Sequence, residues 1–74
     1  MAAQTPDADL QAVSDAAETI REATLRRDEA MAAARDAGNT WRSIALAAEM
    51  TENGVIKAVQ RHLDQVAEQE DQPA

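Results

Sequence analysis

The chain has 74 residues, a net charge of -7, 45% apolar residues and no cysteine. It is long enough for one small domain whose core supplies about 3–5 kcal/mol, and it has neither a disulfide nor a thiolate metal site. No stretch is apolar enough to span a bilayer and the N-terminus lacks a signal-peptide pattern, so we expect a cytoplasmic protein without membrane contact. Alanine, arginine and aspartate are abundant while lysine occurs once, which indicates a bacterium or phage-infected cell as the source.

Residues 6–37 have the composition of one long helix. Pro6 suits the first helical position, and Thr5 before it can cap a free backbone amide. Neither glycine nor proline interrupts the chain until Gly38, where a left-handed glycine would end the helix. We expect residues 1–5 to be disordered.

Two apolar faces follow each other along this helix. Residues 6–23 carry apolar residues at spacings of three and four, and nothing remains within one copy of the chain to cover them unless the end of the last helix reaches them. We therefore predict a homodimer through four residues of this stripe, Leu10, Val13, Ala17 and Ile20. Thr24 and Arg27 break the heptad pattern. Residues 24–37 carry the second face, which we expect to pack on the following helices through Leu25, Met31 and Ala34.

Residues 39–67 have the pattern of two helices joined by a tight turn. Thr40 is a candidate cap for the first helix, which should end near Ala48, and Thr51 is a candidate cap for the second, residues 52–67. The apolar positions predict the rest of the core, centred on the single aromatic residue: Trp41, Ile44, Ala45, Ala48, Met50, Val55 and Val59.

This segment resembles the helix-turn-helix of small DNA-binding proteins from bacteria and phages, and more distantly the DNA-binding region of sigma factors. In that pattern an Ile-Ala pair is followed by a turn glycine, an apolar residue, a Ser/Thr cap and a valine. The matching positions here, apart from the glycine, are Ile44, Ala45, Met50, Thr51 and Val55. The resemblance covers residues 27–63 and implies an all-α domain of three helices.

Two residues depart from the family's pattern. Glu49 occupies the position of the turn glycine, where a positive φ would cost about 1 kcal/mol or more. Gly54 falls in the first turn of the second helix and weakens it by about 1 kcal/mol relative to alanine. This glycine either lets a phosphate or partner approach the backbone, or is tolerated because it lies near a helix end.

The resemblance implies that helix 52–67 enters the major groove of double-stranded DNA. Asn53 and Gln60 carry the donor–acceptor pair that reads adenine, and Lys57 or Arg61 could reach guanine or phosphate. The remaining expected DNA contacts, mostly to the backbone, are Asn39, Thr40, Arg42, Ser43, Thr51 and Gly54. The alternative is an ordinary solvated helix face.

Charge is distributed unevenly along the chain. Residues 1–36 have eight acidic and four basic residues, and residues 64–74 have four acidic residues and no basic one. Residues 37–63 have three basic and two acidic residues, so this is the only part that is not acidic. Acidic flanks disfavour nonspecific binding to nucleic acid, which depends on phosphate contacts.

No group of residues points to catalysis, a cofactor or a metal. His62 is the only histidine, and a packed or surface role is the simplest interpretation. We expect Asp28 and Glu29 to be solvated charges, and residues 68–74 to be an acidic, disordered tail.

The sequence thus predicts a dimeric DNA-binding regulator or phage-type accessory factor rather than an enzyme. One alternative is an acidic interaction module that uses the helix-turn-helix scaffold to bind and inhibit or adapt a basic protein partner. A second alternative is an assembly adaptor that joins this motif to a coiled-coil stalk.

Overall fold

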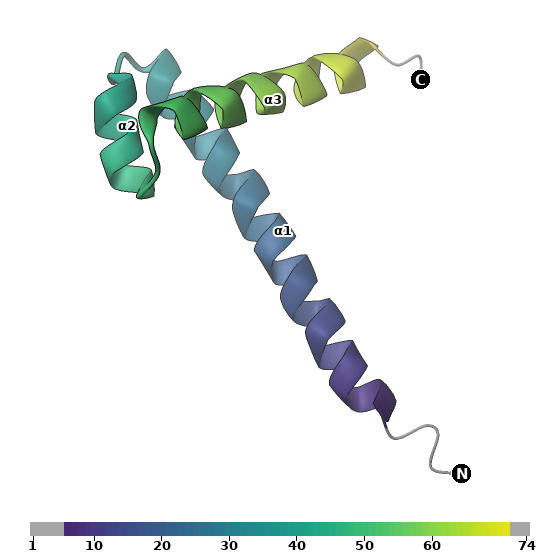
Figure 1. Cartoon of the computed structure of the whole chain (residues 1–74). Helices are drawn as coiled ribbons and strands as arrows, with labels where there is room; N and C mark the ends of the chain where they lie inside the picture. The colour runs from purple at the N-terminus through teal and green to yellow at the C-terminus, as the bar shows by residue number, and fades with distance from the viewer. Residues whose placement is uncertain (1–5, 72–74) are drawn as a thin grey trace.

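The computed structural model describes residues 6–71 and contains three helices, α1 (Pro6–Asp36), α2 (Trp41–Ala48) and α3 (Glu52–Asp71) (Figure 1). The predicted all-α architecture, a long helix followed by two shorter helices packed together, is confirmed, and residues 6–71 contain no strand. The bounds of α2 are those predicted, and α1 ends one residue earlier than expected.

The third helix is longer than predicted. It continues to Asp71, so the expectation that the chain is disordered from residue 68 was wrong for residues 68–71. Glutamate and glutamine are good helix formers, and no glycine or proline occurs in this stretch before Pro73. The end of the predicted tail, residues 72–74, and the predicted disordered residues 1–5 lie outside the described part of the chain.

A glycine ends α1 as the sequence predicts. Gly38 has a φ of 102°, and its N–H donates to the carbonyl of Arg35 at 3.0 Å. The backbone N–H of Asn39 donates to the carbonyl of Ala34 at 3.1 Å, which completes the hydrogen-bond pattern of a Schellman motif.

The turn between α2 and α3 places a glutamate in the left-handed region. Glu49 has φ 58° and ψ 44°, and its N–H is directed at the carbonyls of Ala45 and Leu46. The next N–H, from Met50, donates to the carbonyl of Ala45 at 3.0 Å. The strain expected at this position is therefore present, and the chain changes direction sharply between the two helices.

The core lies where the three helices meet. Its buried members are Met31, Ile44, Ala45, Val55, Ala58 and Val59, and the apolar residues packed at its margin are Ala32, Ala34, Trp41, Ala48 and Met50. Nine of the ten residues predicted for the core belong to one of these groups. Val55, with 0% exposure, is its most buried member.

The expectation that Trp41 is the central residue was wrong, because its ring lies at the margin beside the end of α1.

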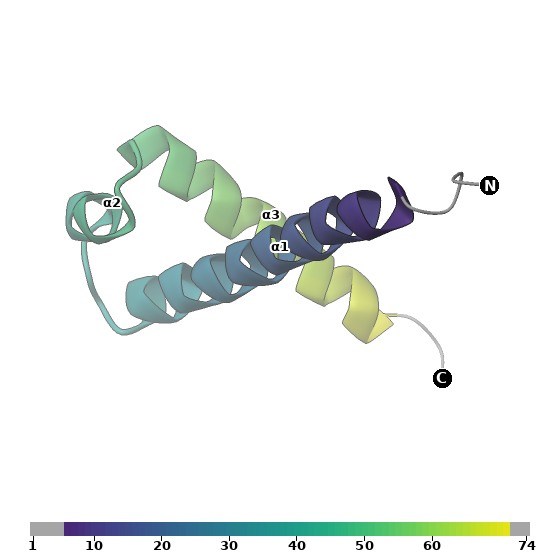
Figure 2. The same cartoon turned by 90° about the horizontal axis from the view of Figure 1, so that it is seen from below.

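Leu25 is the one predicted core residue that lies outside the core. Its exposed fraction is 55%. It lies seven residues before Ala32, on the same side of α1, but at a level where α3 has moved away. Figures 1 and 2 both show α3 crossing α1 at a wide angle. Leu25 therefore lines only an open depression between α1 and α3, with His62 and Val66 on the other side.

Asp28 is buried, contrary to the expectation of a solvated charge. Its exposed fraction is 5%, and its Oδ1 accepts hydrogen bonds from Nε of Arg27 at 3.1 Å and from Nη2 at 2.9 Å. The position is three residues before Met31 and four before Ala32, which places it on the side of α1 that packs on the other helices. An adjacent arginine thus neutralises a carboxylate at the edge of the core.

The N-terminal half of α1 extends away from the other two helices (Figures 1 and 2). We call residues 6–23 the arm. Leu10, Val13 and Ile20 on the arm are exposed. The arm is helical because its sequence consists of good helix formers with two aspartates in the first turn, rather than because it is packed on the rest of the chain.

Candidate nucleic-acid interface

The outward row of α3 is polar and exposed. Four side chains at helical spacing form this row, and all are exposed: Asn53, Lys57, Gln60 and Arg61. Val55, Ala58 and Val59 lie on the opposite side of the same helix and are buried in the core. Burial of one side therefore fixes which residues α3 presents outward, and they are the residues that the sequence predicts for base contacts.

Two further residues border this row. Glu52 is exposed in the first turn of α3, and Ile56 is half-buried along one edge. A carboxylate at the tip of a helix that enters DNA would repel phosphate. The edge isoleucine offers an apolar surface beside the polar row.

The N-terminus of α2 is organised by two hydroxyl groups. The Thr40 hydroxyl accepts the backbone N–H of Ser43 at 3.0 Å and donates to the Ser43 hydroxyl, also at 3.0 Å. The Ser43 hydroxyl therefore keeps its own proton to donate to another group. Arg42 lies beside it and is exposed. These two side chains supply an outward donor and a positive charge at the start of α2.

The other predicted contact residues have structural roles in the turns. The side-chain amide of Asn39 donates to the carbonyl of Ala34 at 2.9 Å, so one of its N–H groups helps to end α1. The Thr51 hydroxyl accepts the backbone N–H of Gly54 at 3.0 Å, which caps α3. These bonds compete with the phosphate contacts expected for Asn39 and Thr51.

The structure gives a local reason for Gly54. A Cβ atom at this position would lie 3.0 Å from the Thr51 hydroxyl oxygen and 3.5 Å from Cε of Met50. The first distance is tighter than ordinary van der Waals contact, so the Thr51 hydroxyl would have to shift by a few tenths of an ångström to admit a side chain at position 54. Crowding against the cap of α3 is therefore a third reason for the glycine, beside the two that the sequence suggests.

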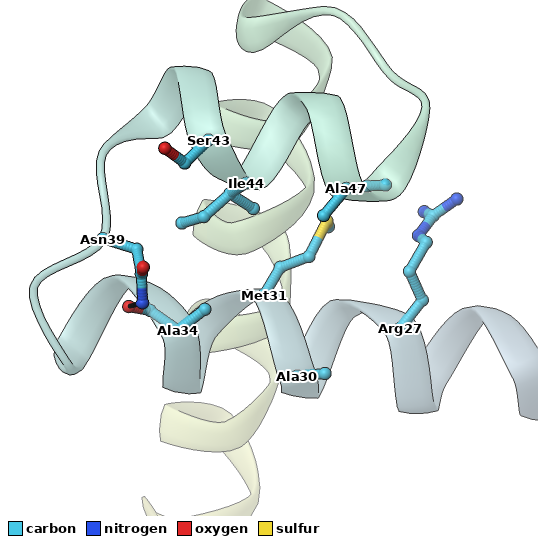
Figure 3. A pocket seen from close by; sticks show the side chains of 9 residues that line it. Arg27, Ala30, Met31, Ala34, Asn39, Ser43, Ile44 and Ala47 are labelled. Atoms are coloured by element: carbon cyan, nitrogen blue, oxygen red, sulfur yellow. Dashed lines mark hydrogen bonds between the residues drawn. The ribbon is translucent and has the colours of Figure 1, made fainter.

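A groove that the sequence analysis did not predict lies between α1 and α2 (Figure 3). Its volume is about 360 Å³, and its lining is Arg27, Ala30, Met31, Ala34, Asn39, Ser43, Ile44, Ala47 and Ala48. We call it the alanine groove, because alanines line both of its sides. In Figure 3, Met31 and Ile44 extend between the two helices, with Arg27 towards one end and Asn39 towards the other. Alanines spaced four apart on α1 were the signal that could have indicated it.

Neither a metal site nor a membrane span is found in the described part of the chain. Across residues 6–71, His, Asp and Glu side chains do not gather in threes as a metal ion would require. None of the three helices combines the length and the apolar character needed to cross a bilayer.

Comparison of the chain with protein-family models, with curated proteins and with solved structures found no match. The fold, the exposed row of α3 and the charges around it are therefore the observations on which a function can be proposed.

Proposed function

We propose that the chain is a small helix-turn-helix DNA-binding protein that works as a homodimer, in transcription regulation or as a phage-type accessory factor. The observation that carries this proposal is the arrangement of α3. Its apolar side is buried against α1 and α2, and its row of amide and basic side chains is left in solvent.

The chemistry of the exposed row suits base edges in the major groove. Asn53 and Gln60 each have an amide whose oxygen can accept from the N6 amino group of adenine and whose NH2 group can donate to N7. Arg61 can donate to O6 and N7 of guanine through two N–H groups. Lys57, between them in the row, would contact either a base or a phosphate. Residues spaced over two turns of one helix read a short run of adjacent base pairs.

The start of α2 supplies the backbone contacts in this proposal. Arg42 contributes a positive charge, and the Ser43 hydroxyl contributes a free donor. Contacts of this kind fix the position of a helix-turn-helix on DNA without reading its sequence.

Charge limits the affinity that such a protein can reach on arbitrary DNA. Residues 37–63 have a net charge of +1, while the parts of the chain on either side have a net charge of -4 each. Few phosphates can be neutralised, so we expect weak nonspecific binding and a shallow dependence on salt. Specific affinity would then have to come from base contacts and from two subunits acting together.

The exposed stripe of the arm supports the dimeric part of the proposal. Leu10, Val13 and Ile20 have exposed fractions of 65%, 66% and 66%. Their burial in a two-fold dimer would place two copies of α3 on one duplex. Half-sites about 34 Å apart in an inverted repeat are the expected target.

A titration with labelled DNA tests this proposal. Fluorescence anisotropy would compare DNA from upstream of the chain's own gene with random DNA of equal length, from about 50 to 200 mM salt. We expect tighter binding to the first duplex, with a salt slope that corresponds to a few phosphate contacts. Absence of binding to both duplexes at low salt, with the protein folded, would contradict the proposal.

The alternative, an acidic module that binds a basic protein, is favoured by two observations. Two glutamates lie near the contact row: Glu49 in the turn before α3 and Glu52 at the first position of α3. Leu46 on α2 is 71% exposed, a large apolar side chain that DNA contact would not need. Failure of the DNA titration, together with tight and salt-sensitive binding to a basic protein, would select this alternative.

A further inference from the structure

One copy of the chain exposes far more surface than a compact protein of its mass. Its radius of gyration is 17.3 Å, where about 11 Å is typical of 74 residues. Its accessible surface is 5832 Å², and a compact monomer of 8.0 kDa exposes about 4,500 Å². The difference exceeds the roughly 800 Å² per partner that a standard interface buries.

The stripe on the arm leads directly to the alanine groove. Continued at heptad spacing from Leu10 and Val13, it passes through Thr24 and Arg27 and reaches Met31 and Ala34. Arg27, Met31 and Ala34 line the groove. The stripe on the arm and the lining of the groove therefore lie along one side of α1, which we call the seam. Thr24 and Arg27 interrupt its apolar character, and Met31 is buried in the core of its own copy. The bulky exposed residues lie near one end of the seam and the groove near the other.

A second row of small residues borders this seam. Alanines recur every seven residues at positions 16, 23 and 30, and all three are exposed. Ala30 is also part of the lining of the groove. Small side chains along a helix allow the backbone of another helix to approach closely, as in other close helix pairs.

We propose that the arm of one copy docks in the alanine groove of a second copy, and that the second arm docks reciprocally in the first groove. The two α1 helices then run antiparallel about a two-fold axis near residue 22. Val13 lies at the level of the partner subunit's Met31, and Leu10 lies at the level of the partner subunit's Ala34. Such an interface is isologous and closes as a dimer.

The charges of α1 favour this orientation. Residues 7–20 carry four acidic side chains and no basic one, whereas residues 21–35 carry four arginines and three acidic side chains. The antiparallel arrangement brings the acidic end of each α1 beside the arginine-bearing half of the other. A parallel arrangement in register would place the four acidic side chains of one arm against those of the other, which is unfavourable.

The amount of buried surface favours the groove over pairing of the arms alone. Arms that contact only each other would bury four apolar side chains per copy, Leu10, Val13, Ala17 and Ile20. These are too few for a standard interface. Docking in the groove covers the arm and the alanines of the groove, twice per dimer. The inference rests on the dimeric part of the proposed function and does not depend on DNA binding.

Disulfide trapping tests the inference, because the chain has no native cysteine. Val13→Cys and Ala30→Cys proteins, mixed in equal amounts and oxidised, should form mainly the mixed disulfide. The two Val13 positions of one dimer would be about 27 Å apart at 1.5 Å per residue, beyond the reach of a disulfide. Gln11→Cys is the matched control, because Gln11 lies on the opposite side of the arm at nearly the same level, and it should trap poorly with Ala30→Cys.

The outcomes separate the inference from the proposals on which it stands. A dimer by sedimentation in which Val13→Cys traps itself as readily as it traps Ala30→Cys would overturn the docking but keep the dimer. A monomer at every concentration tested would overturn both. Neither result decides DNA binding, which the titration measures separately.

Filling the groove provides a second, independent measurement. Ala30 and Ala33 are both exposed on α1, but only Ala30 lines the groove. Ala30→Phe should weaken dimerisation about tenfold or more, because the ring would occupy the space of the partner's arm. Ala33→Phe should change the dissociation constant less than twofold, and equal effects of the two substitutions would contradict docking in the groove.

Discussion

The guanidinium group of Arg35 lies 4.4 Å from the centroid of the Trp41 ring, a cation–π contact that joins the last turn of α1 to the first residue of α2. The same arginine donates from Nη1 to the backbone carbonyl of Asn39 at 3.1 Å. It also lies at the end of a helix where a positive charge is favourable. Trp41 is packed at the margin of the core, and Arg35 covers one face of its ring.

Arg35→Ala should destabilise the protein by about 1–2 kcal/mol, from loss of the cation–π contact, the hydrogen bond and the favourable helix-end charge. Denaturant unfolding followed by the fluorescence of Trp41, the only tryptophan, measures this change directly. Arg21→Ala, which removes an exposed arginine of the same helix, should change stability by less than about 0.5 kcal/mol. Equal losses in the two variants would show that the contact with Trp41 does not contribute.

Glu49→Gly should stabilise the protein by about 0.5–1 kcal/mol, because glycine adopts a φ of 58° without the steric cost that glutamate bears. The shift of the unfolding midpoint measures it. Gly38→Ala is the converse control: no atom lies within 4 Å of the added Cβ, but φ is 102°, so it should destabilise. A loss of stability in Glu49→Gly would mean that the glutamate side chain has a compensating role.

Val55→Ala should cost about 2 kcal/mol, since it removes two methyl groups from a fully buried position. Leu25→Ala removes a larger apolar side chain but should cost less than about 0.5 kcal/mol, because that side chain is largely exposed in one copy of the chain. Thermal unfolding at low protein concentration gives both values. A larger loss at Leu25 than at Val55 would contradict the packing of the three helices.

Arg27→Ala should destabilise the protein more than Asp28→Ala. The first change leaves a carboxylate with 5% exposure without the hydrogen bonds that Arg27 gives it. The second leaves an arginine whose side chain is 38% exposed and can turn towards water. The free energies of unfolding of the two variants are compared by denaturant titration. The reverse order would mean that the hydrogen bonds from Arg27 do not stabilise the buried carboxylate.

The sequence predicts the helices and most of the core because those depend on local signals. Gly38 ends α1 through its left-handed backbone and Thr51 begins α3 through its hydroxyl, and both signals are local in the sequence. The strain at Glu49 follows from the position that it occupies in the turn. The exposed row of α3 follows from the burial of Val55 and Val59 on the other side of the helix.

The errors occur where the angle between α1 and α3 decides the outcome. Periodicity places Leu25 and Asp28 on or near the packed side of α1, but it does not give the level at which α3 diverges. Asp28 is buried, whereas Leu25, about one turn earlier on α1, is exposed. The alanine groove lies between α1 and α2 and was not predicted for a related reason, because a space between helices depends on how closely two of them approach.

The central claim is that the outward row of α3 contacts DNA, and one matched pair of variants tests it most directly. Arg61→Ala and Arg21→Ala each remove one exposed arginine, the first from the row on α3 and the second from the arm. The two variants are compared by fluorescence anisotropy on DNA from upstream of the chain's own gene, at protein concentrations at which sedimentation shows both to be dimers. Arg61→Ala should weaken binding about tenfold, equivalent to the roughly 1–3 kcal/mol of a base contact, and Arg21→Ala should weaken it less than twofold. Equal affinities of the two variants on that DNA would contradict the claim.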